Sequence, residues 1–201
     1  ASWIKASATL PGQTAGAGSV VLESVRRTGD IFGGVQQTVG LVDGTRYAAS
    51  AFLKKGDGGV SWFGLYNSTD VVWQSTVQIN WPASDDPLTA GDISVPANGQ
   101  RSNPSDIRVQ PLSGGIYRLS FVFTAASATG DVVTLNIQAN RNADLTANYF
   151  GGMQLEISPY ATSYIPTTGG TATRAADRGR LGPVAEALLQ RSEASILLQV
   201  R

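Results

Sequence analysis

The stretch that decides the fold is VVWQSTVQINW, residues 71–81. Apolar and polar residues alternate along most of it, which is typical of a strand that buries one face. The apolar side would carry Val71, Trp73, Val77, Ile79 and Trp81, and the polar side Gln74, Thr76, Gln78 and Asn80. We therefore expect a half-buried strand that places Trp73 and Trp81 in the core.

The same period of two recurs along the chain. The segments that show it, or that are further strand candidates, are 19–26, 34–39, 46–54, 60–66, 116–123, 132–140 and 149–157. Turn-forming residues separate them, and the GDGG segment 56–59 is expected to close a hairpin. Many short strands without a helical period between them predict an all-β protein, an antiparallel jelly-roll β-sandwich with an extended C-terminal connector. The polar stretch 82–108 is either a functional loop or holds one short strand near residues 93–95.

The pattern changes towards the end of the chain. Pro159 and Pro166 fix their backbone φ angles, so the chain is expected to leave the sandwich as an extended arm. We predict a domain over residues 1–160 and a connector over 161–191 with a short helix at 184–190. Residues 192–201 would be the first strand of a following domain. Because no initiator Met stands at Ala1, we expect the chain to be a piece of a longer polypeptide.

Composition excludes several classes of function. Lys plus Arg and Asp plus Glu number 15 each, so no net charge attracts nucleic acid or an anionic membrane surface. The chain has no Cys and no His, which removes thiolate nucleophiles and the commonest general base and metal ligand. No apolar run reaches the roughly 18 residues of a membrane span. We therefore expect a non-enzymatic protein without a cofactor, without nucleic acid and without membrane insertion.

Carboxylates are the remaining groups that could carry chemistry. Four of them lie in the polar stretch, namely Asp85, Asp86, Asp92 and Asp106. They are either solvated turn formers or groups that flank a sugar or calcium, and sequence spacing in a loop does not fix the carboxylate separation that glycoside hydrolysis needs. Four more stand at turns or strand ends: Asp43, Asp57, Asp131 and Glu156. A structural calcium is the alternative reading there, although no loop motif supports it.

Aromatic residues give the candidate site. Trp62 and Tyr66 are four residues apart on one expected strand, so they share a face, and Asn67 is adjacent. A sugar ring stacks its C–H face on Trp or Tyr, while amides bind its hydroxyls. The candidate glycan-binding residues are Trp62, Tyr66, Asn67, Gln74, Gln78 and Asn80. The competing interpretation places these aromatic side chains in the core.

Several longer motifs resemble a known family. They are LVDGTRYAASAFLKKGDG (41–58), GGIYRLSFVFTA (114–125), YFGGMQLEIS (149–158) and the exit segment GGMQLEISPYATSYIPTTGGTATRAAD (151–177). Together they resemble carbohydrate-binding modules of the family 4/9 kind, and the exit segment is similar to those of bacteriophage and prophage tail or spike proteins. SEASILLQV (192–200) resembles the first strand of a concanavalin A-like domain. Ile116 and Gly151-Gly152 depart from the family pattern, where an aromatic residue is usual.

The resemblance implies a jelly-roll module, usually non-catalytic, that binds cell-surface polysaccharide. It also implies a place in a virion or outside the cell, beside other tail subunits and often in a trimer. A purely structural, oligomerising module without a glycan ligand is the alternative. A third possibility is the ancillary domain of a glycan-degrading enzyme. The motifs themselves are structural, and none is a ligand signature.

Overall fold

A computed structural model describes residues 4–6, 8–16, 18, 20–28, 34–83, 86–97, 99–139 and 146–167. The chain divides into two units, Ala1–Gly170 and Thr171–Arg201. The helix expected at 184–190 and the strand expected within 192–201 lie outside the described residues, as does most of the expected connector.

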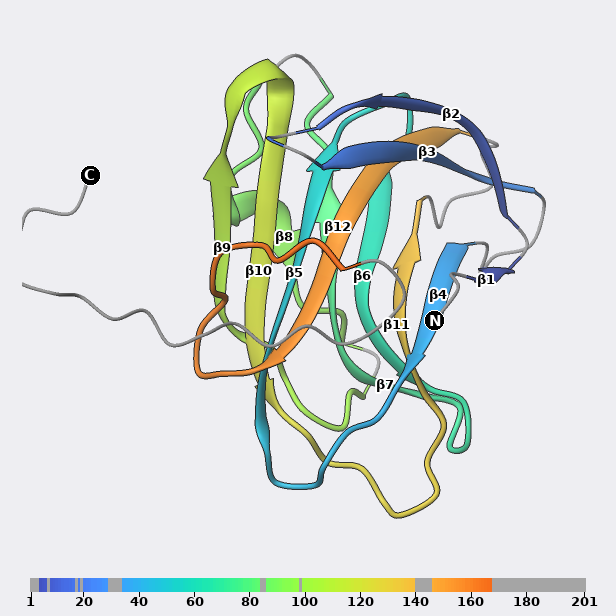
Figure 1. Ribbon diagram of the computed structural model, residues 1–201, viewed down its shortest axis with the longest axis vertical. Coiled ribbons are helices and arrows are strands. Elements are labelled where there is room, and N and C mark those ends of the chain that lie inside the picture. The colour runs from blue at the N-terminus through green and yellow to red at the C-terminus, as the bar shows by residue number, and fades with distance from the viewer. Residues whose placement is uncertain are drawn as a thin grey trace, which may run out of the picture. The chain divides into compact units, whose positions relative to one another are not determined.

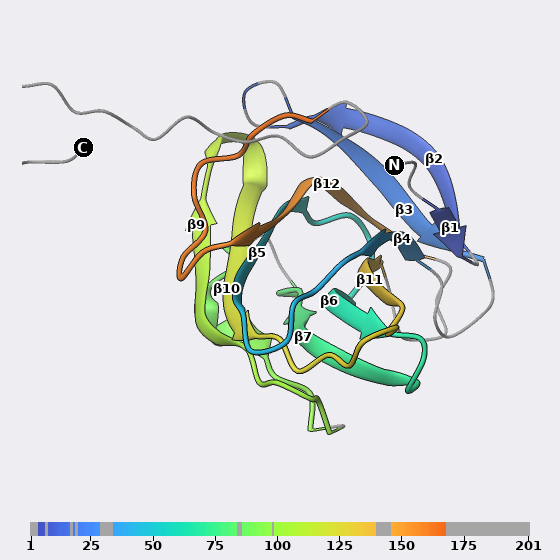
Figure 2. The same cartoon turned by 60° about the horizontal axis from the view of Figure 1, so that its bottom comes forward.

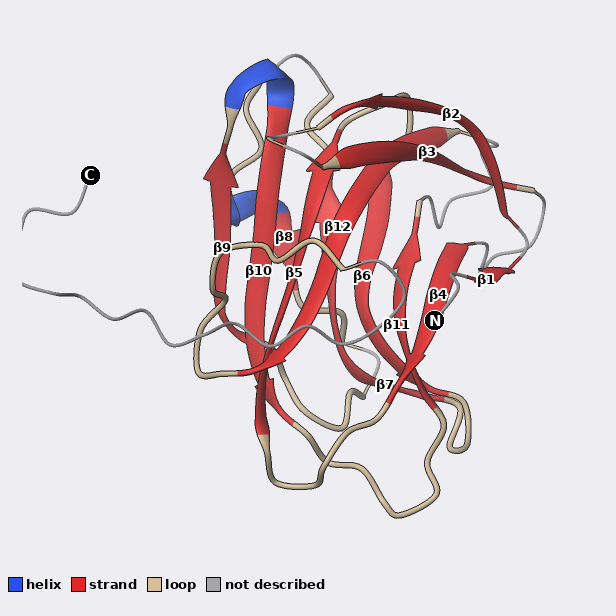
Figure 3. Cartoon of the chain, in the orientation of Figure 1, coloured by secondary structure: helices blue, strands red, loops and turns tan. Residues whose placement is uncertain are grey.

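Two antiparallel sheets form the first unit (Figure 1). Sheet 1 contains, in spatial order, β1 (Ile4–Ala6), β4 (Gly34–Val39), β11 (Val133–Gln138), β6 (Val60–Asn67), β7 (Val72–Asn80) and β8 (Ile93–Ser94). Sheet 2 contains β2 (Ala8–Ala15), β3 (Val21–Arg27), β12 (Ala147–Ile157), β5 (Arg46–Lys54), β10 (Ile116–Thr124) and β9 (Ser105–Pro111). In the described part of the chain the helices are two short 3₁₀ turns, η1 (Ala90–Asp92) and η2 (Ser113–Gly115) (Figure 3).

The structure confirms the predicted all-β sandwich of antiparallel sheets, while the jelly-roll connectivity stays a prediction. Strands predicted at 34–39 and 46–54 match β4 and β5, and the short strand expected near 93–95 is β8. The strands β1, β2 and β9 were not predicted. β2 contains Pro11 and Gly12 at an irregularity of its pairing with β3, which interrupts the alternation that reveals a strand.

Apolar side chains of both sheets meet in one core. Phe63 of β6 and Phe121 of β10 have ring centroids 5.6 Å apart with planes inclined at 70°. Tyr47 stacks on Phe123 at 5.7 Å. Such edge and offset arrangements add about 0.5–1.5 kcal/mol per pair to the burial of the rings themselves. The residues that alternate with them therefore point away from the core on each sheet.

The GDGG segment was expected to close a hairpin, and this expectation is wrong. β5 lies in sheet 2 and β6 lies in sheet 1, so residues 56–59 cross between sheets. The Asp57 N–H donates to the carbonyl of Ala147 (3.0 Å), and the Ala147 N–H donates to Asp57 Oδ1 (2.6 Å). A Cβ on Gly56 would lie 2.1 Å from the Ala147 oxygen, so the glycine is needed for close approach to β12.

A buried asparagine holds this crossover in place. Asn148 of β12 has no exposed surface, and its Oδ1 accepts a 2.7 Å hydrogen bond from the Gly56 N–H. Its Nδ2 lies 2.9 Å from Ser61 Oγ and 3.1 Å from the carbonyl of Ala139. Ser61 and Ala139 belong to the sheet 1 side of the molecule, whereas Asn148 belongs to sheet 2. The side chain thus ties the two sheets together at one end.

The exit segment turns back onto sheet 2 (Figure 1, orange). The Glu156 carboxylate accepts hydrogen bonds from the Thr162 N–H (2.8 Å) and the Thr162 hydroxyl (2.7 Å). Gln154 Oε1 accepts one from the Ile165 N–H (2.9 Å). Tyr164 packs edge-on against Phe52, with centroids 5.5 Å apart. Residues 161–165, expected to begin the extended connector, are therefore fastened to the domain as far as Ile165.

Replacement of Asn148 tests the crossover. We expect Asn148→Ala to lower the free energy of unfolding by about 3 kcal/mol, because buried groups of Gly56, Ser61 and Ala139 lose their partner. Urea denaturation measures this change. The exposed Asn103 supplies a matched control, and Asn103→Ala should change stability by less than about 0.5 kcal/mol. Equal stabilities of the two variants would contradict the role given to Asn148.

Candidate functional site

The outward face of sheet 1 gathers most of the predicted site residues. Trp62 pairs with Gln78 on β7 and with Gln138 on β11, so the three side chains share one face. Phe63, Leu65, Val77, Ile79 and Ile137 alternate with them and point into the core. We call the outward set the amide–aromatic face and define it as Gln36, Trp62, Tyr66, Trp73, Thr76, Gln78, Asn80, Ser94, Thr134, Asn136 and Gln138. Figure 2 shows β6, β7 and β11 adjacent to one another.

Three aromatic rings form the centre of this face. The Trp73 ring lies 5.5 Å from that of Trp62 and 5.3 Å from that of Tyr66. A register shift in the pairing of β6 with β7 sets Trp73 opposite Tyr66 and leaves Gln74 unpaired. Trp73 is buried, as expected, but against these two rings and not with Trp81 in the core between the sheets. Strict alternation cannot show a bulge, which explains the difference.

Amide groups surround the rings. Gln78 Nε2 donates to Asn80 Oδ1 (2.7 Å), and Asn80 Nδ2 donates to Ser94 Oγ and to the carbonyl of Asp92 (3.1 Å each). On β11, Asn136 Nδ2 donates to Gln36 Oε1 (3.1 Å). These bonds orient the amides and fix which of their atoms remain available.

Two acceptors on the face lack a donor. Asn136 and Gln138 are 5% and 3% exposed, and within the described part of the structure neither Asn136 Oδ1 nor Gln138 Oε1 has a hydrogen-bond partner. A buried polar atom without a partner costs about 1–3 kcal/mol, so native proteins rarely keep one without a reason. Both oxygens are enclosed, so a hydrogen-bond donor would satisfy them only after neighbouring side chains move aside.

The face carries no charge. At the outward positions that the structure describes on β4, β6, β7, β8 and β11, the residues are amides, hydroxyl residues, aromatic residues, Gly and Val. The chain has 30 charged side chains, from 15 Lys plus Arg and 15 Asp plus Glu, yet none stands at these positions. A surface of this kind suits a neutral ligand with many hydroxyls.

Four of the six predicted residues therefore lie together: Trp62, Tyr66, Gln78 and Asn80. Tyr66, Gln78 and Asn80 are half-buried, whereas Trp62 is only 4% exposed. The remaining members of the face, chiefly Gln36, Asn136 and Gln138, were missed. The signal was present in residues 132–140, because the positions between Val133, Leu135 and Ile137 are all polar.

Asn67 and Gln74 lie elsewhere and serve the scaffold. Both have no exposed surface. Asn67 Oδ1 accepts from the Thr69 N–H (2.9 Å) and shapes the turn between β6 and β7. The Gln74 carboxamide pairs with the backbone of Ala126, donating to its carbonyl (3.0 Å) and accepting from its N–H (2.7 Å). These amides already have their partners, so they do not contribute to the face.

The acidic candidates are also bound within the fold. Asp43 accepts from the Ser127 N–H (3.1 Å), and Asp106 pairs with Arg108 (2.9 Å). Asp92 caps η1, and hydrogen bonds from Thr89 lower the pKa of its carboxyl. Asp85 lies outside the described residues. In the described part of the chain, no three acidic residues gather in a group that could hold a metal ion.

Comparison with models of known protein families finds no match, and comparison with curated proteins finds no significant match. The resemblance to carbohydrate-binding modules and phage tail proteins therefore stays a prediction. Among the described residues, no helix has the length and apolarity that crossing a membrane requires.

Asp131 provides a test of the loops beside β6 and β7. Hydrogen bonds from the Ala128 N–H, and further ones from Asn67 and Ser127, lower the pKa of its carboxyl in the folded protein. The unfolded chain then binds more protons as the pH falls below about 4, so this stabilisation is present above that pH and is lost below it. We expect Asp131→Asn to lower the melting temperature at pH 7 and to flatten the loss of stability in acid. Thermal unfolding from pH 7 to pH 3 measures both effects, and an unchanged slope would contradict the assignment.

Proposed function

We propose that this chain is a non-catalytic glycan-binding module and that the amide–aromatic face binds a neutral saccharide. The observation that carries the proposal is the pair of unpartnered acceptors, Asn136 Oδ1 and Gln138 Oε1, beside an aromatic cluster on an uncharged face. Sugar hydroxyls are donors of the kind that these two enclosed oxygens lack, and a small shift of the side chains around them would admit such donors. The half-buried Tyr66 offers its ring to a sugar C–H face.

The contributions of the residues differ. Trp62 and Trp73 are 4% and 6% exposed, so their rings support Tyr66 and the neighbouring amides and offer little stacking area of their own. Gln36, Gln78 and Asn80 are more accessible and would bind hydroxyls at the margin. Hydrogen bonding, more than stacking, would therefore set the affinity and the specificity.

The biological setting is a further part of the proposal. We place the module in a phage-type tail fibre or spike, in the virion or outside the cell, where it attaches the particle to host surface polysaccharide. The support is the resemblance of the exit segment, together with the fastening of residues 161–165 onto sheet 2, which fixes where the chain leaves the domain. Other tail subunits, and two further copies of this chain in a trimer, are the proposed partners.

A second candidate function is a structural, oligomerising module without a glycan ligand. The observation that favours it is the burial of Trp62 and Trp73, because their rings already have partners within the domain. The two functions make different predictions for the effect on glycan binding of removing an unpartnered oxygen, such as Gln138 Oε1.

Gln138→Met separates the two functions. Methionine keeps the length of the side chain but removes the unpartnered oxygen, so we expect the free energy of unfolding to rise by about 1 kcal/mol. If the face binds glycan, the affinity for a neutral polysaccharide should fall about tenfold, equivalent to about 1.4 kcal/mol. A panel of neutral and acidic polysaccharides, measured by calorimetry beside urea denaturation, gives both readouts.

Gln110 of β9 provides the control, because it is exposed and lies on sheet 2. Gln110→Met should change neither stability nor binding. The glycan proposal fails if the wild-type protein binds no polysaccharide of the panel, or if Gln138→Met binds as tightly as the wild type. Higher stability of Gln138→Met without any glycan binding would favour the structural module.

A further inference from the structure

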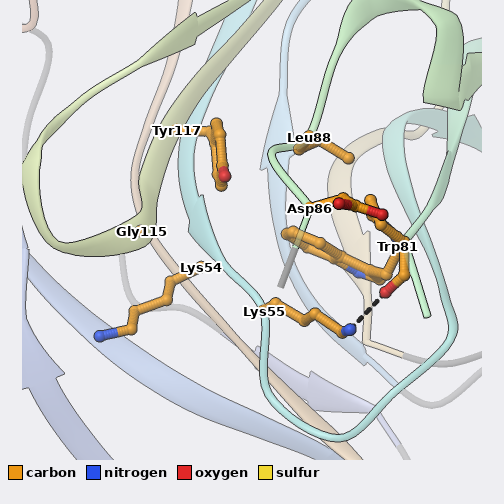
Figure 4. A pocket seen from close by; sticks show the side chains of 8 residues that line it. Lys54, Lys55, Trp81, Asp86, Leu88, Gly115 and Tyr117 are labelled. Carbon is orange, nitrogen blue, oxygen red and sulfur yellow. Dashed lines mark hydrogen bonds between the residues drawn. The ribbon is translucent and has the colours of Figure 1, made fainter. Parts of the chain in front are cut away.

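A pocket of about 150 Å³ opens at the end of the sandwich where β5 and β7 end and β10 begins (Figure 4). Trp81, Leu88 and Tyr117 form its apolar walls. Lys54, Lys55 and Asp86 lie around its mouth. None of the residues that line this pocket belongs to the amide–aromatic face.

Hydrogen bonds hold the Trp81 wall of this pocket in place. Trp81 is 6% exposed, and its Nε1–H donates to Ser61 Oγ (2.9 Å) while its backbone N–H donates to the carbonyl of Gly59 (2.9 Å). The Lys55 ammonium donates to the carbonyl of Pro82 and tethers the following loop to the end of β5. The Trp81 wall and the adjoining Pro82 are therefore held in place before any ligand enters, which reduces the cost of binding there.

Among the described residues that line the pocket, Lys54 and Lys55 carry ammonium groups and Asp86 carries a carboxylate. Lys54 is half-exposed at the rim, and Figure 4 shows its side chain directed away from Trp81. Within the described residues Lys54 forms no salt bridge, so its ammonium can turn to an anionic ligand without breaking one. The Asp86 side chain is exposed, and its carboxylate has several lone pairs, so it can accept a hydrogen bond from a ligand hydroxyl.

We infer that this pocket binds the terminal, carboxylate-bearing sugar residue of an acidic glycan, end-on. The ring's C–H face packs on the half-buried Tyr117, with the more deeply buried Trp81 behind it, while the carboxylate pairs with Lys54 and a hydroxyl donates to Asp86. The volume is below the roughly 300–1,000 Å³ of drug-sized sites, so it suits one sugar unit and not a chain. The inference rests on the proposed function only in taking the ligand to be a saccharide.

The test uses free D-glucuronate and, as its neutral counterpart, D-glucose. Nuclear magnetic resonance titration of the whole chain follows the indole N–H of Trp81 and the ring of Tyr117. We expect saturable shifts with glucuronate at a Kd on the order of 1 mM, and weaker binding of glucose. Lys54→Gln should reduce glucuronate affinity by about twofold to fivefold, the range of an exposed ion pair, and leave glucose unchanged.

Arg26→Gln is the matched control, since it removes one positive charge at an exposed position of β3. It should leave both titrations as in the wild type. The inference is overturned if glucuronate does not shift Trp81 and Tyr117, if glucose binds as tightly, or if Lys54→Gln has no effect.

The proposals for the face and for the pocket can be refuted independently of each other. Loss of neutral polysaccharide binding in Gln138→Met, with no glucuronate shift in the wild type, would uphold the face and refute the pocket. Glucuronate shifts that Lys54→Gln weakens and Gln138→Met leaves intact, with no polysaccharide bound at the face, would refute the face and uphold the pocket.

Discussion

The carboxamide of Asn148 is the interaction on which the two sheets depend. It reaches from β12 across the open end of the sandwich to Gly56, Ser61 and Ala139, and Ser61 in turn accepts the indole N–H of Trp81. A buried network of this kind is stabilising only when its members are satisfied together. Its geometry therefore sets the crossover at residues 56–59, the start of β6 and the position of Trp81, which lines the pocket of Figure 4.

The molecule separates uncharged from charged surfaces. The outward face of sheet 1 has amides, hydroxyls and aromatic rings, whereas sheet 2 presents Arg118 and Glu156 beneath the exit segment. Burial lowers the pKa of the Arg118 guanidinium, and the nearby Glu156 carboxylate opposes this shift. When a neutral ligand leaves water and binds the outward face of sheet 1, neither partner carries a charge that loses its hydration. The free-energy cost of desolvation is therefore small. The second surface is occupied by the chain's own residues.

The QLE and ATSYIPT elements of the exit segment have a structural explanation. Gln154 and Glu156 point from β12 to Thr162 and Ile165, so residues far apart in the motif form one hydrogen-bonded clip. The clip needs these residue types at this spacing whatever the protein binds. The motif thus reports how the chain leaves the sandwich, and the case for glycan binding depends on sheet 1.

Local sequence determined the class of fold and most of the strands, because alternation with a period of two depends only on neighbouring residues and a common core. Alternation also placed Trp62 with Tyr66 on one side of β6, and Gln78 with Asn80 on one side of β7, and the pairing of the two strands joined these sides into one face. Tertiary structure decided what alternation cannot encode. The bulge opposite Tyr66 turned Trp73 outward, contacts at the strand ends took Asn67 and Gln74 into the scaffold, and pairing of β11 with β6 brought Asn136 and Gln138 to the face. These outcomes depend on partners distant in sequence, and only the folded chain brings such partners together.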